Sequence, residues 1–244
     1  MNMLRVDFII AVGLLFASCK QAADSSAASS PAAPSPAAAT QSTGTPGVNS
    51  GLGQAPGTAG TPQSAAVGAI PQAWIGTWRT AACSLITGGQ TYVLMQLSIA
   101  ANGSYNNIAR EFTDPGCTQL LNTTTVVSTM VAGAASTAVP SATEVSHTNL
   151  QYAYLSNSQA DAIETNRFFA ASAQKSPPCA GINVVVGTNI DITNCAKGLW
   201  GGKVDSLIAV TGNTLYQGDC SGNACISPAR ATSLDTTKPF TRVQ

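Results

Sequence analysis

Cysteine is the residue whose number and spacing carry the most chemistry in this 244-residue sequence. One cysteine stands at position 19 and six follow at Cys83, Cys117, Cys179, Cys195, Cys220 and Cys225. An even number of cysteines is typical of disulfides in an oxidising compartment, so we expect three bridges from these six. Fifteen pairings are compatible with six cysteines, and each bridge formed in sequence order would close a short loop around a predicted turn. Each bridge would add roughly 2–4 kcal/mol of stability. No metal site is expected, because neither a second closely spaced cysteine pair nor a nearby histidine accompanies Cys220 and Cys225.

Acid–base chemistry has few candidates in this sequence. His147 is the only histidine, and Glu144 could face it across a turn. The alternating run VSHTNLQYAYL around His147 predicts an exposed strand position instead. Two pairs of carboxylates stand three residues apart, Glu111 with Asp114 and Asp161 with Glu164.

Such pairs near turns are typical of solvated edges and helix caps, although a pair in a cleft could hydrolyse glycosides. The sequence contains no Gly-x-Ser-x-Gly elbow, no phosphate-binding glycine loop and no His-Glu-x-x-His. We therefore expect no enzyme and no cofactor.

The charge balance excludes partners that are recognised by charge alone. Eleven basic and eleven acidic residues give a formal net charge of zero, and charged residues make up only 9% of the chain. No basic run could neutralise several phosphates, so no nucleic-acid partner is expected. Partners must be recognised by shape, apolar contact or neutral hydrogen bonds.

The first 18 residues have the pattern of a signal peptide. Arg5 supplies a positive start, and a short apolar stretch runs from Phe8 to Phe16. The stretch is too short to span a bilayer. The segment that ends it, LFASC at residues 15–19, resembles the bacterial lipobox. The resemblance implies that Cys19 is acylated and becomes the mature N-terminus, which anchors the chain in a membrane. In that family Lys20, rather than an aspartate, implies the outer membrane of a Gram-negative cell.

Residues 19–70 have the composition of a flexible tether. After Cys19 they contain no aromatic residue, only Lys20 and Asp24 as charges, and many Ala, Ser, Pro and Gly residues. Such a segment buries too little apolar surface to offset its ordering entropy, so we expect it to be disordered. As a flexible coil it would span on the order of 40 Å.

Residues 71–244 form the predicted folded domain, which is all-β. Segments of alternating apolar and β-branched residues are separated by turn signals. Strands are expected at 74–84, 91–100, 104–113, 120–131, 145–155, 183–193, 205–210, 214–218 and 240–243. Asn102-Gly103 and Gly212-Asn213 predict hairpin turns with positive φ. One short helix is expected after Ser158, which can cap it at Asp161.

Eight or nine antiparallel strands favour a closed barrel over a β-sandwich, the alternative, because closure removes exposed edges. Three segments also resemble lipocalin-like proteins: Gly76-Thr77-Trp78, the hairpin LIAVTGNTLYQG, and the terminal FTR. The resemblance implies a barrel that binds a small, apolar ligand. It places Trp78 at the closed end and Val93, Met95 and Leu97 along the ligand.

A packed barrel that docks a partner is the second interpretation of the same sequence. Its outer surface would bind cell-wall glycan, stacked on Trp74 or Trp200, or another envelope protein. The sequence contains the aromatic and small residues that either role needs.

Overall fold

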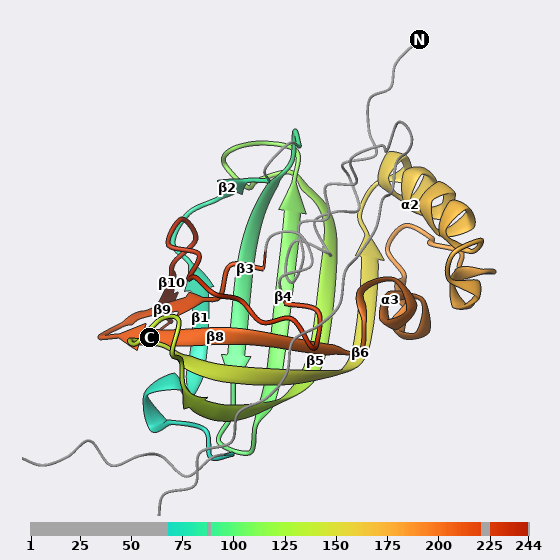
Figure 1. The fold of residues 1–244 in the computed structure, drawn as a ribbon. Coiled ribbons are helices and arrows are strands. Elements are labelled where there is room, and N and C mark those ends of the chain that lie inside the picture. Colours follow the sequence, from blue (N-terminus) through green and yellow to red (C-terminus); the bar gives the residue numbers. More distant parts are fainter. Residues whose placement is uncertain (1–67, 87–88, 221–224, 244) are drawn as a thin grey trace, which may run out of the picture. The chain divides into compact units, whose positions relative to one another are not determined.

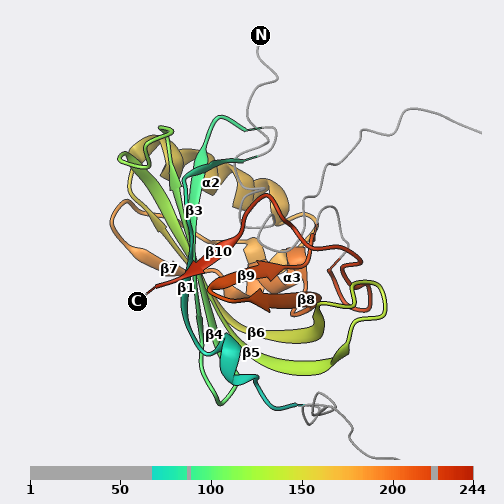
Figure 2. The same cartoon turned by 90° about the vertical axis from the view of Figure 1, so that its left-hand side faces the viewer.

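Eight antiparallel strands close into a barrel, with two further strands outside the ring (Figure 1, Figure 2). The computed structural model describes residues 68–86, 89–220 and 225–243, which all belong to one structural unit. The architecture confirms the predicted all-β barrel over the β-sandwich. The predicted signal peptide (1–18), Cys19 and the tether up to residue 67 lie outside the described residues.

The strands follow one another around the ring as a meander. The sheet order is β1-β10-β9-β8-β6-β5-β4-β3, and β3 pairs with β1 to close the ring. The ring strands are β1 (Gly76–Thr80), β3 (Tyr92–Ile99), β4 (Ser104–Phe112), β5 (Leu120–Ala135), β6 (Thr143–Ser156), β8 (Lys203–Thr211), β9 (Thr214–Gln217) and β10 (Phe240–Arg242). Outside it, β2 (Ser84–Leu85) pairs with β3 and β7 (Asn189–Asp191) pairs with β6.

The alternation of side chains along each strand determines which residues form the core. In β3 every second residue is buried, and β4 and β5 continue the same pattern through direct register pairs such as Leu97 with Asn107 and Asn107 with Val126. In a closed barrel the buried set faces the interior. The register between β5 and β6 shifts between Val127 and Ser128, which marks a β-bulge. On its other side, β6 pairs with β8 along its first half and with β7 along its second half.

The first and last strands of the chain, β1 and β10, meet side by side in the ring. The guanidinium of Arg242 lies over the indole of Trp78, with its Cζ 4.3 Å from the ring centroid. Arg242 also donates to the carbonyls of Ala73 and Ile75, and Trp78 Nε1 donates to the Trp74 carbonyl at 2.8 Å. These bonds tie the short 3-10 turn η1 (Gln72–Trp74), cyan in Figure 1, across one end of the barrel.

Both predicted hairpin turns are present, with different geometries. Thr211 and Thr214 pair around Gly212-Asn213, where Gly212 has the positive φ of 59° that a two-residue hairpin requires. Asn102-Gly103 belongs to a longer loop, because the Ala100 amide donates to the Ser104 carbonyl and only Gly103 has a positive φ.

Two α-helices lie between β6 and β8, where one was expected. Ser158 caps α2 (Gln159–Ser172) by accepting the Asp161 amide, as predicted. The second, α3 (Thr193–Trp200), begins where the sequence predicted the end of a strand. Only β7 of the predicted strand 183–193 forms. Within the described ranges, neither helix is long and apolar enough to cross a bilayer.

Three disulfides pair the cysteines in sequence order. Cys83–Cys117 joins the segment between β1 and β2 to the β4–β5 turn, and Cys220–Cys225 closes a small loop. Cys179–Cys195 joins α3 to the 3-10 turn η2 (Pro177–Cys179). The pairing that closes the shortest loops is therefore the one found.

The barrel contacts extend slightly upstream of the predicted domain start at residue 71. The Gly68 amide donates to the Ala132 carbonyl at 2.8 Å, and Ile70 packs against the core. Two of the last three residues assigned to the tether, Gly68 and Ile70, thus already contact β5 or the core.

Gly103 is expected to be irreplaceable in the β3–β4 loop. Its φ is +80°, and an added Cβ would lie 2.6 Å from the Met130 carbonyl oxygen. Gly103→Ala should lower the free energy of unfolding by about 2–4 kcal/mol, measured by urea denaturation. Gly187→Ala is the matched control, because Gly187 has a φ of +76° and open space around its Cα. Equal losses in the two variants would show that crowding against β5 contributes nothing.

Candidate functional site

The barrel interior has an apolar wall and a polar wall. The apolar wall is formed by the inward residues of β3: Val93, Met95, Leu97 and Ile99. The polar wall comes from β4 and β5, whose inward residues include Asn107, Glu111, Asn122, Thr124 and Ser128. The two walls are adjacent because β3 pairs with β4 along its whole length.

The four predicted ligand-lining residues all face this interior. Trp78 and Leu97 are fully buried and stand directly opposite each other in the β1–β3 pairing. Val93 and Met95 lie farther along β3, at 8% and 9% exposure. Trp78 is held by Arg242 at the end of the barrel that η1 crosses, so its position is structural, whereas Val93 and Met95 border the polar wall.

Several buried polar atoms of the polar wall have no hydrogen-bond partner among the described residues. They are Oδ1 of Asn122, Oγ1 of Thr124 and both side-chain heteroatoms of Asn107. The Asn107 amide lies close enough to Tyr105 to influence that hydroxyl, without normal hydrogen-bond geometry. All three residues are at most 2% exposed. Buried polar atoms are almost always paired, so this concentration calls for an explanation.

A cluster of two carboxyl groups continues the polar wall toward α2. Asn122 Nδ2 donates to Glu111 Oε2 at 3.1 Å and to Asp161 Oδ1 at 3.2 Å. The Tyr154 hydroxyl lies 2.9 Å from both Asp161 oxygens and 3.1 Å from Thr165 Oγ1. No ion pair to Glu111 or Asp161 occurs within the described part of the chain.

Burial sets the protonation of this cluster. Desolvation, reinforced by the charge of Asp161, raises the pKa of Glu111 to about 8, against the opposing hydrogen bond from Asn122. Burial also raises the pKa of Asp161. Glu111 is therefore largely the neutral acid at pH 7, and as such it can donate a hydrogen bond into the interior.

His147 lies inside the barrel, and the predicted exposed strand position is wrong. It is 1% exposed, and its ring lies 4.5 Å from that of Tyr105. Burial lowers the pKa of His147 to about 4, so the imidazole is neutral at pH 7. Glu144, its proposed proton-transfer partner, belongs to the opposite face of β6, where its carboxylate lies 3.5 Å from Arg230 Nε. The two side chains lie on opposite faces of β6.

Trp74 and Trp200, the two residues expected to stack a surface glycan, differ in their burial. Trp74 is 5% exposed and gives its carbonyl to Trp78, so it cannot stack a surface glycan. Trp200 is half-buried, with its ring centroid 6.3 Å from that of Tyr152. No group of three potential metal ligands gathers within the described residues.

No protein-family model matches this sequence, and no curated protein matches it significantly. Function must therefore be argued from the geometry of the barrel itself.

Sequence analysis missed the central grouping of this interior. It paired Glu111 with Asp114 and Asp161 with Glu164 because each pair is close in sequence. The structure instead joins Glu111 to Asp161 through Asn122 on β5. The available signal was the inward phase of β4, in which Glu111 follows Tyr105, Asn107 and Ala109 at every second position.

The buried Glu111 predicts a fall in stability as pH rises. Between pH 4.5, its ordinary pKa, and about 8, the unfolded chain loses this proton while the folded protein keeps it. The free energy of unfolding should therefore decrease across this window and level off above it, by roughly 2–5 kcal/mol in all. In Glu111→Gln, which keeps an acceptor for Asn122, most of this decrease should vanish.

Urea titrations between pH 4.5 and 9 would measure the effect. Glu164→Gln is the control, because Glu164 is an exposed carboxylate of α2 paired only with Arg167. A Glu111→Gln protein that loses stability with pH as steeply as the parent would show that Glu111 is ionised in the fold.

Proposed function

We propose that this protein is an acyl-anchored lipoprotein of the bacterial cell envelope whose barrel binds a small amphiphilic molecule. The observation that carries the proposal is the set of unpaired polar atoms of Asn107, Asn122 and Thr124 beside the apolar wall of β3. A purely apolar ligand, as the lipocalin resemblance implies, would leave these atoms unpaired.

The energetic cost of the polar wall supports a binding role. Each buried polar atom without a partner costs about 1–3 kcal/mol, and isosteric apolar residues would remove that cost. Sites that break the rules of packing are frequently functional. A wall that is destabilising in the empty protein fits a ligand that supplies the missing partners.

The atom types specify the ligand further. Asn122 Oδ1 can only accept, so the ligand must carry a donor; Asn107 Nδ2 can only donate, so it must also carry an acceptor. Val93 and Met95 stand beside the same wall and would contact an apolar portion. An amphiphile with a hydroxyl or amide head and a short apolar body meets these requirements.

The anchor at Cys19 is the second part of the proposal. Three disulfides support an oxidising compartment, which agrees with export by the predicted signal peptide. Acyl chains at Cys19 would hold the chain at the membrane, with Lys20 directing it to the outer membrane. A packed barrel that docks glycan or another envelope protein is the alternative outcome of the experiments below.

Thr124→Val is expected to separate binding from folding. Removing the unpaired hydroxyl with an isosteric group should stabilise the empty protein by about 1 kcal/mol and weaken ligand retention about tenfold. The test uses the exported mature chain with Cys19→Ala, incubated with an organic extract of bacterial envelopes and examined by native mass spectrometry. A bound adduct in the parent that is depleted in Thr124→Val is the expected result.

Thr123→Val is the matched control, because Thr123 is the neighbouring β5 residue on the opposite face. A parent protein that never retains an adduct, together with a Thr124→Val protein that is less stable, would refute the binding role. It would assign the polar wall to the packing of a structural barrel.

The proposed acylation predicts that lipid labelling and membrane location depend on residues 19 and 20. The parent should incorporate labelled palmitate and fractionate with outer membranes, and Cys19→Ala should do neither. Lys20→Asp is the companion variant, which should keep the label and move to the inner membrane. A Cys19→Ala protein that stays membrane-bound would overturn the anchor without bearing on the barrel.

A further inference from the structure

Two buried carboxyl groups meet at the contact between the barrel interior and α2. Asn122 Nδ2 donates to Glu111 Oε2 at 3.1 Å and to Asp161 Oδ1 at 3.2 Å, so one amide nitrogen holds both groups close together. Glu111 and Asp161, here named the carboxyl pair, are at most 2% exposed. A buried charge in a protein is normally paired or binds a cation, so any charge on this pair calls for a partner.

Hydrogen bonds favour a negative charge on one member of the pair. The side chains of Tyr154, Ser156 and Asn122 all favour the ionised form of Asp161, against the larger effect of burial, which raises its pKa. Glu111 receives one such bond, from Asn122, and the charge of Asp161 raises its pKa further. In the empty barrel the charge of the pair therefore lies mainly on Asp161, while Glu111 is neutral.

The described part of the chain supplies no counter-charge for the carboxyl pair. None of its ion pairs includes either carboxyl group. Arg110 adjoins Glu111 in sequence and therefore belongs to the opposite face of β4. Arg167 of α2 is bound to Glu164 at the surface.

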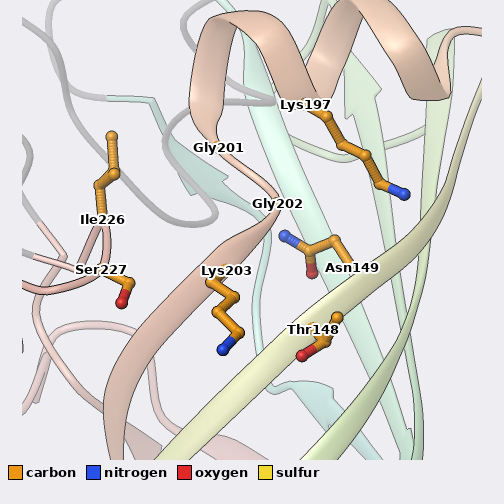
Figure 3. Close-up of a pocket in the computed structure, with 8 residues that line it drawn as sticks. All are labelled: Thr148, Asn149, Lys197, Gly201, Gly202, Lys203, Ile226 and Ser227. Carbon is orange, nitrogen blue, oxygen red and sulfur yellow. The ribbon is translucent and has the colours of Figure 1, made fainter.

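The lysines of α3 and β8 are also directed elsewhere. Lys197 and Lys203 border an open hollow at the end of α3 (Figure 3). Lys197 donates to the Leu150 carbonyl at 3.3 Å and lies near Asp191, and Lys203 lies near Asp205. Neither lysine is therefore available to the carboxyl pair.

Unpaired oxygen atoms lie beside the carboxyl pair. Asn122 Oδ1 has no hydrogen-bond partner among the described residues, although Asn122 is only 2% exposed. It belongs to the same amide group whose nitrogen joins the two carboxyl groups. Thr124 Oγ1, on the next inward residue of β5, is likewise buried and unpaired. Asn122 also leaves Oε1 of Glu111 unengaged, because it donates to Oε2.

We propose that the carboxyl pair binds a primary ammonium group of the barrel's ligand, an inference that rests on the function proposed above. An ammonium group has three N–H donors and no acceptor, so it can bind Glu111 and the unpaired oxygens of Asn122 and Thr124 together. Its positive charge compensates Asp161 and favours the ionised form of Glu111, which the empty barrel keeps neutral. The ligand is then an amphiphilic amine, which carries an amino group in addition to its hydroxyl or amide.

An organic ammonium group fits this place better than a metal ion. No third Asp, Glu, His or Cys side chain joins the carboxyl pair within the described ranges. Val93 stands opposite Glu111 in the β3–β4 pairing, and Met95 is the next inward residue of β3. These apolar side chains cannot bind the water molecules of a hydrated metal ion, but they would contact the apolar body of an amine.

Binding of an amine should release a proton from Glu111. The titratable groups that face Glu111 from neighbouring elements are Asp161 of α2 and Tyr154 of β6, and burial raises the pKa of Tyr154, which stays neutral. The inward residues of β3 and β5 carry no ionisable group. Since the pKa of Glu111 is about 8, about one proton should leave per bound amine at pH 7. The affinity should rise about tenfold per pH unit from pH 6 to 8 and level off above.

Two probes with the same apolar body separate recognition of the ammonium group from recognition of a neutral head. They are n-octylamine, which stays protonated up to about pH 10, and 1-octanol. The mature chain with Cys19→Ala is titrated with each by calorimetry between pH 6 and 9, in buffers with different enthalpies of ionisation. Octylamine should bind about tenfold or more tightly than octanol at pH 8, with the proton release and the rise with pH. Octanol binding should show neither effect.

Glu111→Gln tests the assignment to the carboxyl pair. The variant keeps an acceptor for Asn122 but cannot ionise, so octylamine binding at pH 8 should weaken about tenfold or more and lose its dependence on pH. Glu164→Gln is the matched control, because Glu164 is a carboxylate of α2 bound to Arg167 at the surface. It should change neither property. Circular dichroism and the urea unfolding midpoint check that both variants fold.

The possible failures of this inference and of the barrel's binding role are distinguishable. Equal binding of octylamine and octanol without proton release would overturn the ammonium site and leave the binding of amphiphiles intact. An adduct from envelope extract on a parent that binds neither probe would do the same. Binding of calcium without binding of octylamine would assign the carboxyl pair to a metal ion instead. A folded parent that binds neither probe and no molecule of the extract would refute both proposals.

Discussion

Closure of the ring is the constraint on which the rest of this structure depends. β1 must pair with β10 on one side and β3 on the other, and it has only five residues with which to do so. The contact of Arg242 with the Trp78 indole and with the carbonyls of η1 joins the two ends of the domain at this seam. Once closed, the barrel has no free edges in its ring, and its interior is shielded from water. That shielding gives the inward polar side chains of β4 and β5 their unusual energetics.

The polar wall and the α2 cluster share one physical origin. Inside a low-dielectric barrel, an unpaired oxygen is costly and a carboxyl group keeps its proton. Asn122 takes part in both effects, because its amide nitrogen joins Glu111 to Asp161 while its oxygen has no partner. The inward residues of β3 offer no donor to these groups, because all of them are apolar. The apolar wall therefore leaves the polar groups opposite it without partners from β3.

The sequence predicted what depends on local patterns and missed what depends on distant contacts. Period-two alternation located the ring strands, glycine located the hairpins, and Ser158 located the start of α2. The predicted strand at 183–193 failed because β6 pairs with it only at Asn189–Asp191, after which the Cys179–Cys195 bridge joins a helix to η2. Glu111 and Asp161 stand fifty positions apart, so no spacing rule could join them. The burial of His147 depended on the phase of β6, which alternation alone leaves open between two faces.

Net charge was the least informative property of this sequence, because it does not show which charges are paired and which are neutralised by burial. Equal numbers of acids and bases gave no reason to expect a charged ligand. Yet on the outer face of β6 and β8, Arg230 engages both Glu144 and Asp205, so these charges are paired. Inside the barrel the opposite holds, because burial neutralises Glu111 and His147 and selects for hydrogen bonding over charge. One chain without net charge thus presents paired charges on its outer face and a neutral polar wall inside.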